Sequence, residues 1–196
     1  MSTKITRTLY RWAKRIGLIS ISIVEKVSDG DIRQIRNLIQ SEAVLGHMLE
    51  RSDAEIRRKI EEGQVAVCFF QHPHILLGTC SFDVWSSDWI EIGGAAVGRK
   101  WRGLGIGTDL IRISSTAAHK AYPKALIFAL TDSTQRRFSP KHPFERVGYQ
   151  RIEKSVHAAS MEVVGVWREC SLGNCRHQAE FPHCQCSLMI RRNGKE

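Results

Sequence analysis

A glycine-rich stretch near the middle of the chain has residue types and a spacing suited to binding phosphate. It reads Arg102-Gly103-Leu104-Gly105-Ile106-Gly107, and it joins a strand-like segment, Trp89 to Val97, to a helix-like segment from about Gly107 to Ala121. Glycines let the backbone turn tightly and approach a ligand closely. The free N–H groups and the positive dipole end of the following helix attract phosphate oxygens. Arg99 and Lys100 add positive charge beside this turn.

The spacing of the glycines excludes two common phosphate-binding motifs. Gly107 is followed by Thr108 rather than by Lys and Ser or Thr, so the Walker pattern is absent. Glycines at every second position also differ from the dinucleotide fingerprint. Instead, Arg102-x-x-Gly105-x-Gly107 resembles the acetyl-CoA motif of the GNAT N-acetyltransferases, Arg/Gln-x-x-Gly-x-Gly/Ala. The stretch also follows the fourth expected strand and opens the third helix of the core, as the motif does in that superfamily.

This resemblance implies the GNAT fold from about Ile19 to Ile152, with acetyl-CoA as the co-substrate. It implies that amides of the glycine-rich turn hold the pyrophosphate of coenzyme A, and that the end of the preceding strand lines the pantetheine arm. The cofactor-binding residues carried over in this way are Ala95, Ala96, Val97, Arg99, Arg102, Gly103, Leu104, Gly105, Ile106, Gly107 and Thr108.

Glu91 is the candidate catalytic base. An acceptor amine must be neutral to attack a thioester, and deprotonation at pH 7 costs about 1 kcal/mol for an α-amine and about 4.6 kcal/mol for a lysine. Glu91 lies six residues before Val97, a spacing at which some histone acetyltransferases of the superfamily carry their catalytic glutamate. It would act directly or through a water, although a surface glutamate on a strand remains the alternative. Glycines near Gly93 to Ala95 indicate a bulge whose N–H groups would meet the oxyanion.

The general acid stays unassigned. Many GNAT enzymes carry a tyrosine in a Tyr-x-x-x-Gly-Phe context that protonates the departing thiolate. Here Phe144 takes the place of that tyrosine and has no proton to give, while Tyr149 takes the place of the phenylalanine and is expected to face the core. A thiol with a pKa of about 8.5 is a tolerable leaving group without an acid, so activity is not excluded.

A narrower resemblance concerns the short N-acetylglutamate synthases. Gly46 to Ser52, followed by Glu55-Ile56, resembles their Gly-x-Leu-Leu-x-Arg-Ser-x-x-Glu-Ile stretch, and the tail resembles their Trp-x-x-Cys-x-x-Cys…Phe-Pro-x-Cys pattern with altered cysteine spacing. The resemblance implies a small-molecule amine acceptor, the α-amine of an amino acid such as glutamate, with Arg51 binding its carboxylate. Arg51 as a solvated charge before a helix stays open. A protein (lysine or N-terminal) acetyltransferase and a non-catalytic acyl-CoA-binding module also stay open.

The cysteine-rich tail suggests a structural zinc site as one of three interpretations. The candidate ligands Cys170, Cys175, Cys184 and Cys186 lie near His177 and His183, and zinc needs four ligands in tetrahedral geometry. Because the spacing matches no standard zinc finger, reduced thiols and a redox or disulfide role stay open.

The elements that must position these residues alternate along the chain. Their order is strand, two helices, three strands joined by short turns, helix, strand, short helix and strand, which predicts an α/β protein: a GNAT fold with a mixed, mostly antiparallel central sheet and helices on both faces. We expect a basic amphipathic segment over 1–18, the acetyltransferase core over 19–155, and a Cys/His-containing extension with the last strand over 156–196.

Charge and hydropathy limit the classes of partner that the protein is expected to bind. The chain has 196 residues and a net charge of +9, which suits anionic partners or serves solubility alone. No apolar run is long enough to span a membrane. No signal peptide and no standard nucleic-acid motif are recognisable, so we expect a cytoplasmic protein that does not bind nucleic acid.

The first 24 residues carry five basic side chains and no acid, and one helical stripe is expected to contain Ile5, Leu9, Trp12, Ile16 and Ile19. Such a helix suits peripheral contact with a membrane or a protein, fits the composition of a mitochondrial transit peptide, or packs on its own domain. A homodimer is also left open.

Overall fold

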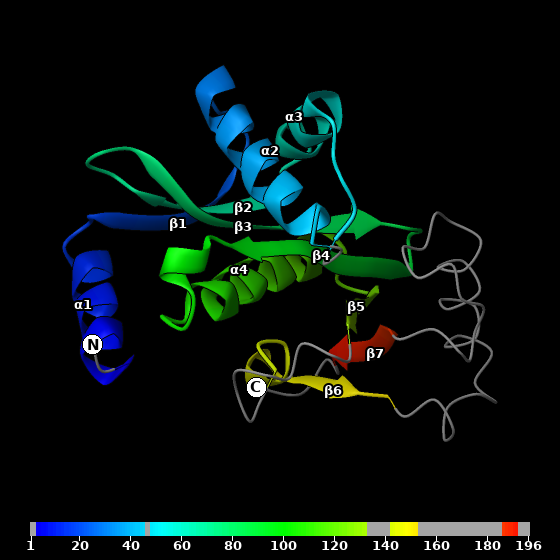
Figure 1. Ribbon diagram of the computed structural model, residues 1–196. Coiled ribbons are helices and arrows are strands. Elements are labelled where there is room, and N and C mark those ends of the chain that lie inside the picture. Colours follow the sequence, from blue (N-terminus) through cyan, green and yellow to red (C-terminus); the bar gives the residue numbers. More distant parts are fainter. Residues whose placement is uncertain (1–2, 46–47, 133–141, 153–185, 192–196) are drawn as a thin grey trace.

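The computed structural model describes residues 3–45, 48–132, 142–152 and 186–191 (Figure 1). The elements in chain order are α1 (Thr3–Arg15), β1 (Ile19–Val24), α2 (Asp29–Ala43), α3 (Asp53–Glu61), β2 (Val65–Phe70), β3 (Ile75–Val84), β4 (Trp89–Val97), the 3-10 helix η1 (Arg99–Trp101), α4 (Ile106–Ala121), β5 (Leu126–Asp132), the 3-10 helix η3 (Glu145–Val147), β6 (Tyr149–Arg151) and β7 (Cys186–Arg191). The strands form one seven-stranded sheet in the order β1-β2-β3-β4-β5-β7-β6.

Helices α2 and α3 begin at capping boxes and cover one face of the sheet. Ser52 Oγ accepts a hydrogen bond from the Glu55 N–H at 3.2 Å, and the Glu55 carboxylate accepts one from the Ser52 N–H at 2.9 Å, as the sequence predicts. Ser28 and Asp31 repeat the arrangement at the start of α2. The isoleucines of both helices pack against one face of β2; these are Ile32, Ile35, Ile39, Ile56 and Ile60.

Helix α4 packs on the opposite face, so the sheet is covered on both sides (Figure 1). Along β2, Val65 and Val67 belong to the cluster under α2 and α3, whereas Ala66 and Cys68 belong to the cluster under α4. This alternation follows from the two-residue period of a strand. The fold class predicted from the sequence, a mixed and mostly antiparallel sheet with helices on both faces, is therefore confirmed.

Strand pairing changes from antiparallel to parallel at β4, and β4 separates from β5 part-way along its length. Strands β1 to β4 are antiparallel neighbours, whereas β4 and β5 are parallel and are connected through α4. The parallel pairing covers only Trp89 to Glu91 of β4, while β5 continues along its whole length beside β7. Beyond Glu91, the edge of β4 that faces β5 has no strand partner among the described residues.

A bulge near Gly94 accompanies this opening. Ser81 pairs with Gly93 and Thr79 pairs with Ala96, so β4 carries one residue more than β3 between these two pairs. Gly94 has φ +58°, a left-handed conformation that side chains other than glycine rarely adopt. The bulge expected from the glycines at this point of the sequence is thus present.

Helix α1 packs against the body of the protein. Tyr10 is 5% exposed and belongs to the core cluster that includes the buried face of α4. Leu9, Trp12 and Ile16 are 52%, 49% and 47% exposed, so this part of the apolar stripe expected from the sequence faces away from the core. Ile19, expected on the same stripe, instead begins β1 and is buried. The helix instead docks through the neighbouring face that carries Tyr10. No helix in the described part of the chain has the length and hydropathy needed to cross a membrane.

The predicted zinc ligands Cys170, Cys175 and Cys184 lie outside the described residues, and of Cys186 the structure describes only its backbone at the start of β7. Within the described ranges, no cluster of three His, Cys, Asp or Glu side chains is arranged to hold a metal ion. Zinc binding therefore has no support from the structure.

Candidate functional site

The glycine-rich turn leads from the end of β4 into the first turn of α4. Gly103 and Gly105 have φ values of +81° and +106°, and Gly105 is the N-cap of α4. A Cβ atom added at either position would meet nothing within 4 Å. Glycine is therefore required there by backbone conformation and not by space. Because the N-cap has no side chain, no side chain caps α4, and the amides of its first turn are available to an anion.

Arg102 anchors the turn to two other elements. Its Nε donates to the Val97 carbonyl oxygen at 3.0 Å, and its Nη2 lies 2.5 Å from Glu42 Oε1 on α2. The Arg102 side chain is 43% exposed while that of Glu42 is 8% exposed. The carboxylate thus offsets part of the positive charge that the sequence placed at the turn, whereas Arg99 and Lys100 on η1 are exposed.

Helix α1 supplies further basic groups at this turn, and sequence reasoning did not find them. Arg7 Nε donates to the Gly103 carbonyl oxygen at 2.8 Å, although 96 residues separate the two in the chain. Asp109, in the first turn of α4, accepts hydrogen bonds from Tyr10 at 3.0 Å and from Lys14 at 2.9 Å. Burial alone would raise the pKa of Asp109, but the hydrogen bonds from Lys14 and other donors lower it overall.

Residues Ala95 to Val97, predicted to line the pantetheine arm, lie between the bulge and the glycine-rich turn. Ala95 is exposed, Val97 is partly exposed, and Ala96 is buried. They belong to the part of β4 that no longer pairs with β5. Unpaired strand edges bind extended amide-containing molecules by backbone hydrogen bonds, so this edge is suited to a ligand with amide groups.

Glu91 lies at the point where β4 and β5 separate. It is partly buried, and its Oε1 is 3.7 Å from the position that a Cβ atom of Gly93 would occupy. Burial and, to a smaller extent, the charge of Asp83 together raise the pKa of Glu91 to about 7, against a hydrogen bond from Trp85 that lowers it. Asp83 is the direct partner of Glu91 across the β3–β4 pair. A carboxylate with this pKa can accept a proton at neutral pH.

A buried lysine and a partly buried arginine surround Asp83. The Lys59 side chain is 5% exposed, donates to the Asp83 carboxylate and also donates to the Phe82 carbonyl oxygen at 3.2 Å. Burial lowers the pKa of Lys59, and the charge of Asp83 opposes this shift. Arg51 Nη2 lies 3.7 Å from Asp83 Oδ2. Arg51 and Glu91, which were identified separately from the sequence, thus both lie beside the carboxylate of Asp83.

Arg51 is also engaged with the helix that follows it. Its Nη1 donates to Glu55 Oε1 at 3.2 Å, and its side chain is 31% exposed. Sequence reasoning missed Asp83 and Lys59 because neither belongs to a recognisable motif. The signal that could have found Asp83 is the β3–β4 hairpin, whose short turn places it opposite Glu91. No comparable signal in the sequence indicates Lys59.

Phe144 and Tyr149 lie in the core beside α4. Phe144 is 5% exposed, and its ring meets that of Tyr149 edge-on with 5.0 Å between centroids. The Tyr149 hydroxyl is 2.7 Å from Ser115 Oγ, and burial raises the pKa of Tyr149 above its ordinary value. Tyr149 faces the core, as its place in the sequence suggested. Neither ring is arranged to protonate a leaving thiolate.

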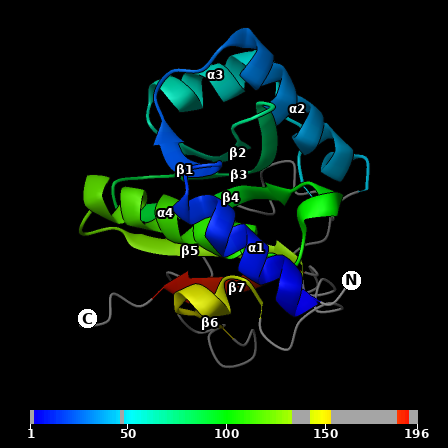
Figure 2. The same cartoon turned by 90° about the vertical axis from the view of Figure 1, so that its left-hand side faces the viewer.

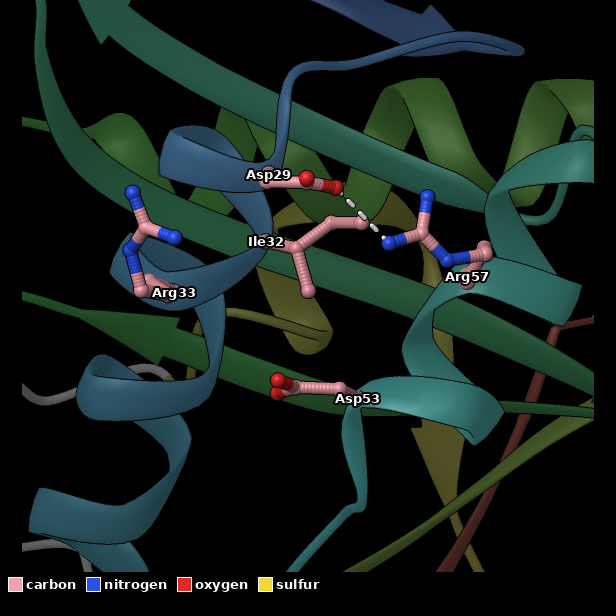
Figure 3. A pocket seen from close by; sticks show the side chains of 5 residues that line it. All are labelled: Asp29, Ile32, Arg33, Asp53 and Arg57. Atoms are coloured by element: carbon pink, nitrogen blue, oxygen red, sulfur yellow. Dashed lines mark hydrogen bonds and ion pairs between the residues drawn. The ribbon is translucent and has the colours of Figure 1, made fainter.

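A cavity of about 270 Å³ lies between α2 and α3 and contains none of these residues. Its lining is mostly charged, and Arg57 Nη2 is 2.8 Å from Asp29 Oδ1 across it (Figure 3). The other lining residues are Ile32, Arg33 and Asp53. Charges of both signs therefore line this cavity, and none of its lining residues belongs to the glycine-rich turn or to the surroundings of Glu91.

Neither a protein-family model nor a curated protein sequence matches the chain. N-acetylglutamate synthase from Neisseria gonorrhoeae, solved with coenzyme A and N-acetyl-glutamate, is similar in structure with a TM-score of 0.63 and 20% identity, over 90% of this chain and 35% of that one. This chain therefore spans only about a third of the length of that synthase.

Two shorter proteins are covered almost completely. A Mycobacterium tuberculosis protein solved with CoA gives a TM-score of 0.60 and 20% identity over 88% of this chain and 98% of that one. Arabidopsis thaliana Naa50, solved with the bisubstrate analogue CoA-Ac-MVNAL, gives 0.54 and 14% over 90% and 99%. The protein therefore has the GNAT fold. At these identities the similarity establishes the fold alone.

Proposed function

We propose that the protein is an acetyl-CoA-dependent N-acetyltransferase that transfers an acetyl group to a primary amine. The observation that carries the proposal is the continuous path along β4. It begins at Glu91, follows the edge of β4 that is not paired with β5, and ends at the N-terminus of α4, which no side chain caps. Coenzyme A has a thioester, an amide-rich arm and a pyrophosphate in that order, which matches the order of these three features. The fold similarity to proteins solved with coenzyme A supports the same assignment.

In this mechanism Glu91 removes a proton from the acceptor amine, directly or through a water. The amine nitrogen then attacks the thioester carbonyl carbon, and the developing oxyanion is stabilised by backbone N–H groups at the Gly93 to Ala95 bulge. Collapse of the intermediate breaks the carbon–sulfur bond and releases the thiolate of coenzyme A. The nitrogen, which became positively charged on attack, loses its second proton to solvent and leaves a neutral amide. Because a thiol has a pKa of about 8.5, the thiolate leaves without an acid.

We propose the α-amine of an amino acid, such as glutamate, as the acceptor. Arg51 lies beside Asp83, the cross-strand partner of Glu91, so a carboxylate held by Arg51 would keep its own amine close to the base. An α-amine also suits a single base with a pKa of about 7, because its deprotonation is much less costly than that of a lysine.

A peptide amine is the second candidate acceptor. Val84 and Trp85 are 38% and 37% exposed, and Trp85 hydrogen-bonds to Glu91. Exposed apolar groups beside the base suit an apolar first side chain of a peptide better than a free acidic amino acid. The Naa50 complex with a peptide-containing analogue belongs to the same fold.

The test is the release of free thiol from acetyl-CoA in the presence of a panel of amino acids, simple amines and peptides. Glutamate-dependent release would support the amino-acid acceptor, and release with peptides alone would assign the second candidate. Glu91→Gln should abolish most turnover while leaving coenzyme A binding unchanged, and Glu61→Gln on the exposed face of α3 is the matched control. Well-folded protein that binds no acetyl-CoA would refute the proposal.

A further inference from the structure

Helix α1 lies against the start of α4, where the proposed pyrophosphate site is. Figure 2 shows α1 in front of α4, and three hydrogen bonds establish the contact: Arg7 to Gly103, Tyr10 to Asp109 and Lys14 to Asp109. The buried side chain of Tyr10 joins the same core cluster as Ile106 and Leu110 of α4. The helix is therefore docked on the coenzyme side of the molecule by both polar and apolar contacts.

The α1 contacts also change the charge at the start of α4. Asp109 places a carboxylate in the first turn of the helix, where a bound phosphate would experience repulsion. Lys14 binds one oxygen of this carboxylate at 2.9 Å, and Arg112 binds the other at 2.7 Å. With Asp109 matched in this way, Arg7 remains as an additional positive charge at the turn, and the exposed Arg11 adds another on the same helix.

The order of groups along coenzyme A indicates what these arginines would meet. The molecule continues past its pyrophosphate into an adenosine that carries a 3′-phosphate. On the protein, the β4 edge is followed by the glycine-rich turn, and the turn is followed by Arg7, whose Nε donates a hydrogen bond to the Gly103 carbonyl oxygen. Arg11 lies one turn further along α1, on the same side of the helix as Arg7. Guanidinium groups bind phosphate oxygens through paired, charge-assisted hydrogen bonds.

We propose that α1 is part of the coenzyme site and that Arg7 and Arg11 recognise the 3′-phosphate of coenzyme A. This inference rests on the proposed function, since it names a further part of the same binding site. It assigns the basic N-terminal helix a role in selecting coenzyme A over forms of the molecule that lack this phosphate.

The experiment compares the dissociation constants of coenzyme A and 3′-dephospho-coenzyme A by isothermal titration calorimetry, using the full chain. The wild-type protein should prefer coenzyme A by about tenfold or more. Arg11→Gln and the double variant Arg7→Gln/Arg11→Gln should lose most of this preference, through weaker binding of coenzyme A with little change for the dephospho form. Arg33→Gln/Arg57→Gln, which removes the same charge beside the α2–α3 cavity, should retain the preference.

Each other outcome contradicts the inference in a recognisable way. Equal weakening of both ligands in the double variant would restrict Arg7 to supporting the turn. Arg11→Gln separates the two roles because Arg11, unlike Arg7, makes no hydrogen bond to the turn among the described residues. A wild-type protein that binds both ligands equally would overturn the 3′-phosphate assignment while leaving the proposed function intact. A wild-type protein that binds neither ligand would overturn the proposed function itself.

Discussion

At the scale of residues, the environment of Glu91 determines how the proposed reaction depends on pH. Burial and the neighbouring charge of Asp83 raise the pKa of Glu91 to about 7, whereas Arg51 and Lys59 oppose this shift. Only the ionised carboxylate accepts a proton, so the base is inactive below this pKa and active above it. A neutral-pH base therefore arises from one partly buried glutamate without a histidine.

We expect kcat/KM to rise with pH through a midpoint of about 7. Glu91→Gln should lower kcat/KM by about 10²- to 10⁴-fold and remove this part of the profile. The ionisation of an α-amine acceptor, at about pH 8, adds a second rise that persists in the variant. The measurement is the initial rate of thiol release across pH 5.5 to 9, roughly the range that spans both groups. An unchanged profile in the variant would exclude Glu91 as the base.

Asp83→Asn provides a second test with a defined sign. The substitution removes a negative charge that raises the pKa of Glu91 and frees the positive charge of Lys59, and both effects favour ionised Glu91. The midpoint of the kcat/KM profile should therefore move to lower pH. Asp88→Asn, at the exposed turn of the same hairpin, should leave it unchanged. A shift to higher pH would show that Asp83 acts through structure and not through charge.

The stability of Asp83→Asn needs to be measured beside its pH profile. Lys59 is buried and would lose its carboxylate partner, and breaking a buried ion pair costs about 3–5 kcal/mol. The thermal unfolding curve of the variant therefore gives the temperature range in which it stays folded, and its pH profile is measured within that range. Arg51 contacts the same carboxylate at a longer distance, 3.7 Å, and is not expected to replace Lys59.

Some of the site residues were predictable from the sequence and others were not. Glu91 and the glycine-rich turn follow from local spacing, since both lie on one strand and the turn after it. Asp83 could be found only through the pairing of β3 with β4, and Lys59 could not be identified, because its contact with Asp83 depends on how α3 docks against β3. The same reasoning applies to Glu42, which reaches Arg102 across 60 residues of sequence.

At the scale of elements, the turn between β4 and α4 depends on backbone conformation. Gly105 has φ +106° and caps α4 without a side chain. Gly105→Ala should lower the free energy of unfolding by about 1–2 kcal/mol, because a Cβ atom disfavours this conformation. It should also weaken acetyl-CoA binding, because relaxation of the turn would move the first amides of α4.

The matched control is Gly30→Ala in the first turn of α2, where φ is not positive and the added Cβ atom would lie 3.4 Å from Ser28 Oγ. This variant should be no less stable than the wild type, because alanine favours a helix over glycine, and should keep the wild-type affinity for acetyl-CoA. Chemical denaturation and calorimetry measure the two quantities. Normal coenzyme affinity in folded Gly105→Ala would show that the conformation of the turn is not needed for binding.

The elements differ in how far the sequence predicted them. Strand β4 and helix α4 were expected almost at their observed bounds, because a glycine-rich turn separates a strand pattern from a helix pattern. The position of β7 between β5 and β6 was not expected, since hydrophobic periodicity identifies a strand but not its neighbours. In α1 the apolar stripe faces away from the core, because hydrogen bonds from Arg7, Tyr10 and Lys14 orient the helix.

At the scale of the whole molecule, the net charge of +9 does not by itself create a binding site. Basic residues occur on both sides of the sheet, but their surroundings differ. Arg57 beside the α2–α3 cavity is paired with Asp29, whereas Arg99 and Lys100 are exposed next to the uncapped end of α4. Charge concentrated at one end of a site raises the local concentration of an anionic ligand.

This distribution predicts how salt affects the proposed reaction. The KM for acetyl-CoA should rise several-fold between about 0.05 and 0.5 M NaCl, because the Debye length shortens over that range, while kcat should change little. Arg99→Gln/Lys100→Gln should raise the KM at low salt and flatten its dependence on NaCl. Arg33→Gln/Arg57→Gln removes an equal charge elsewhere and should keep the wild-type dependence. An equal effect of both double variants would mean that overall charge, and not the charge beside the glycine-rich turn, attracts the coenzyme.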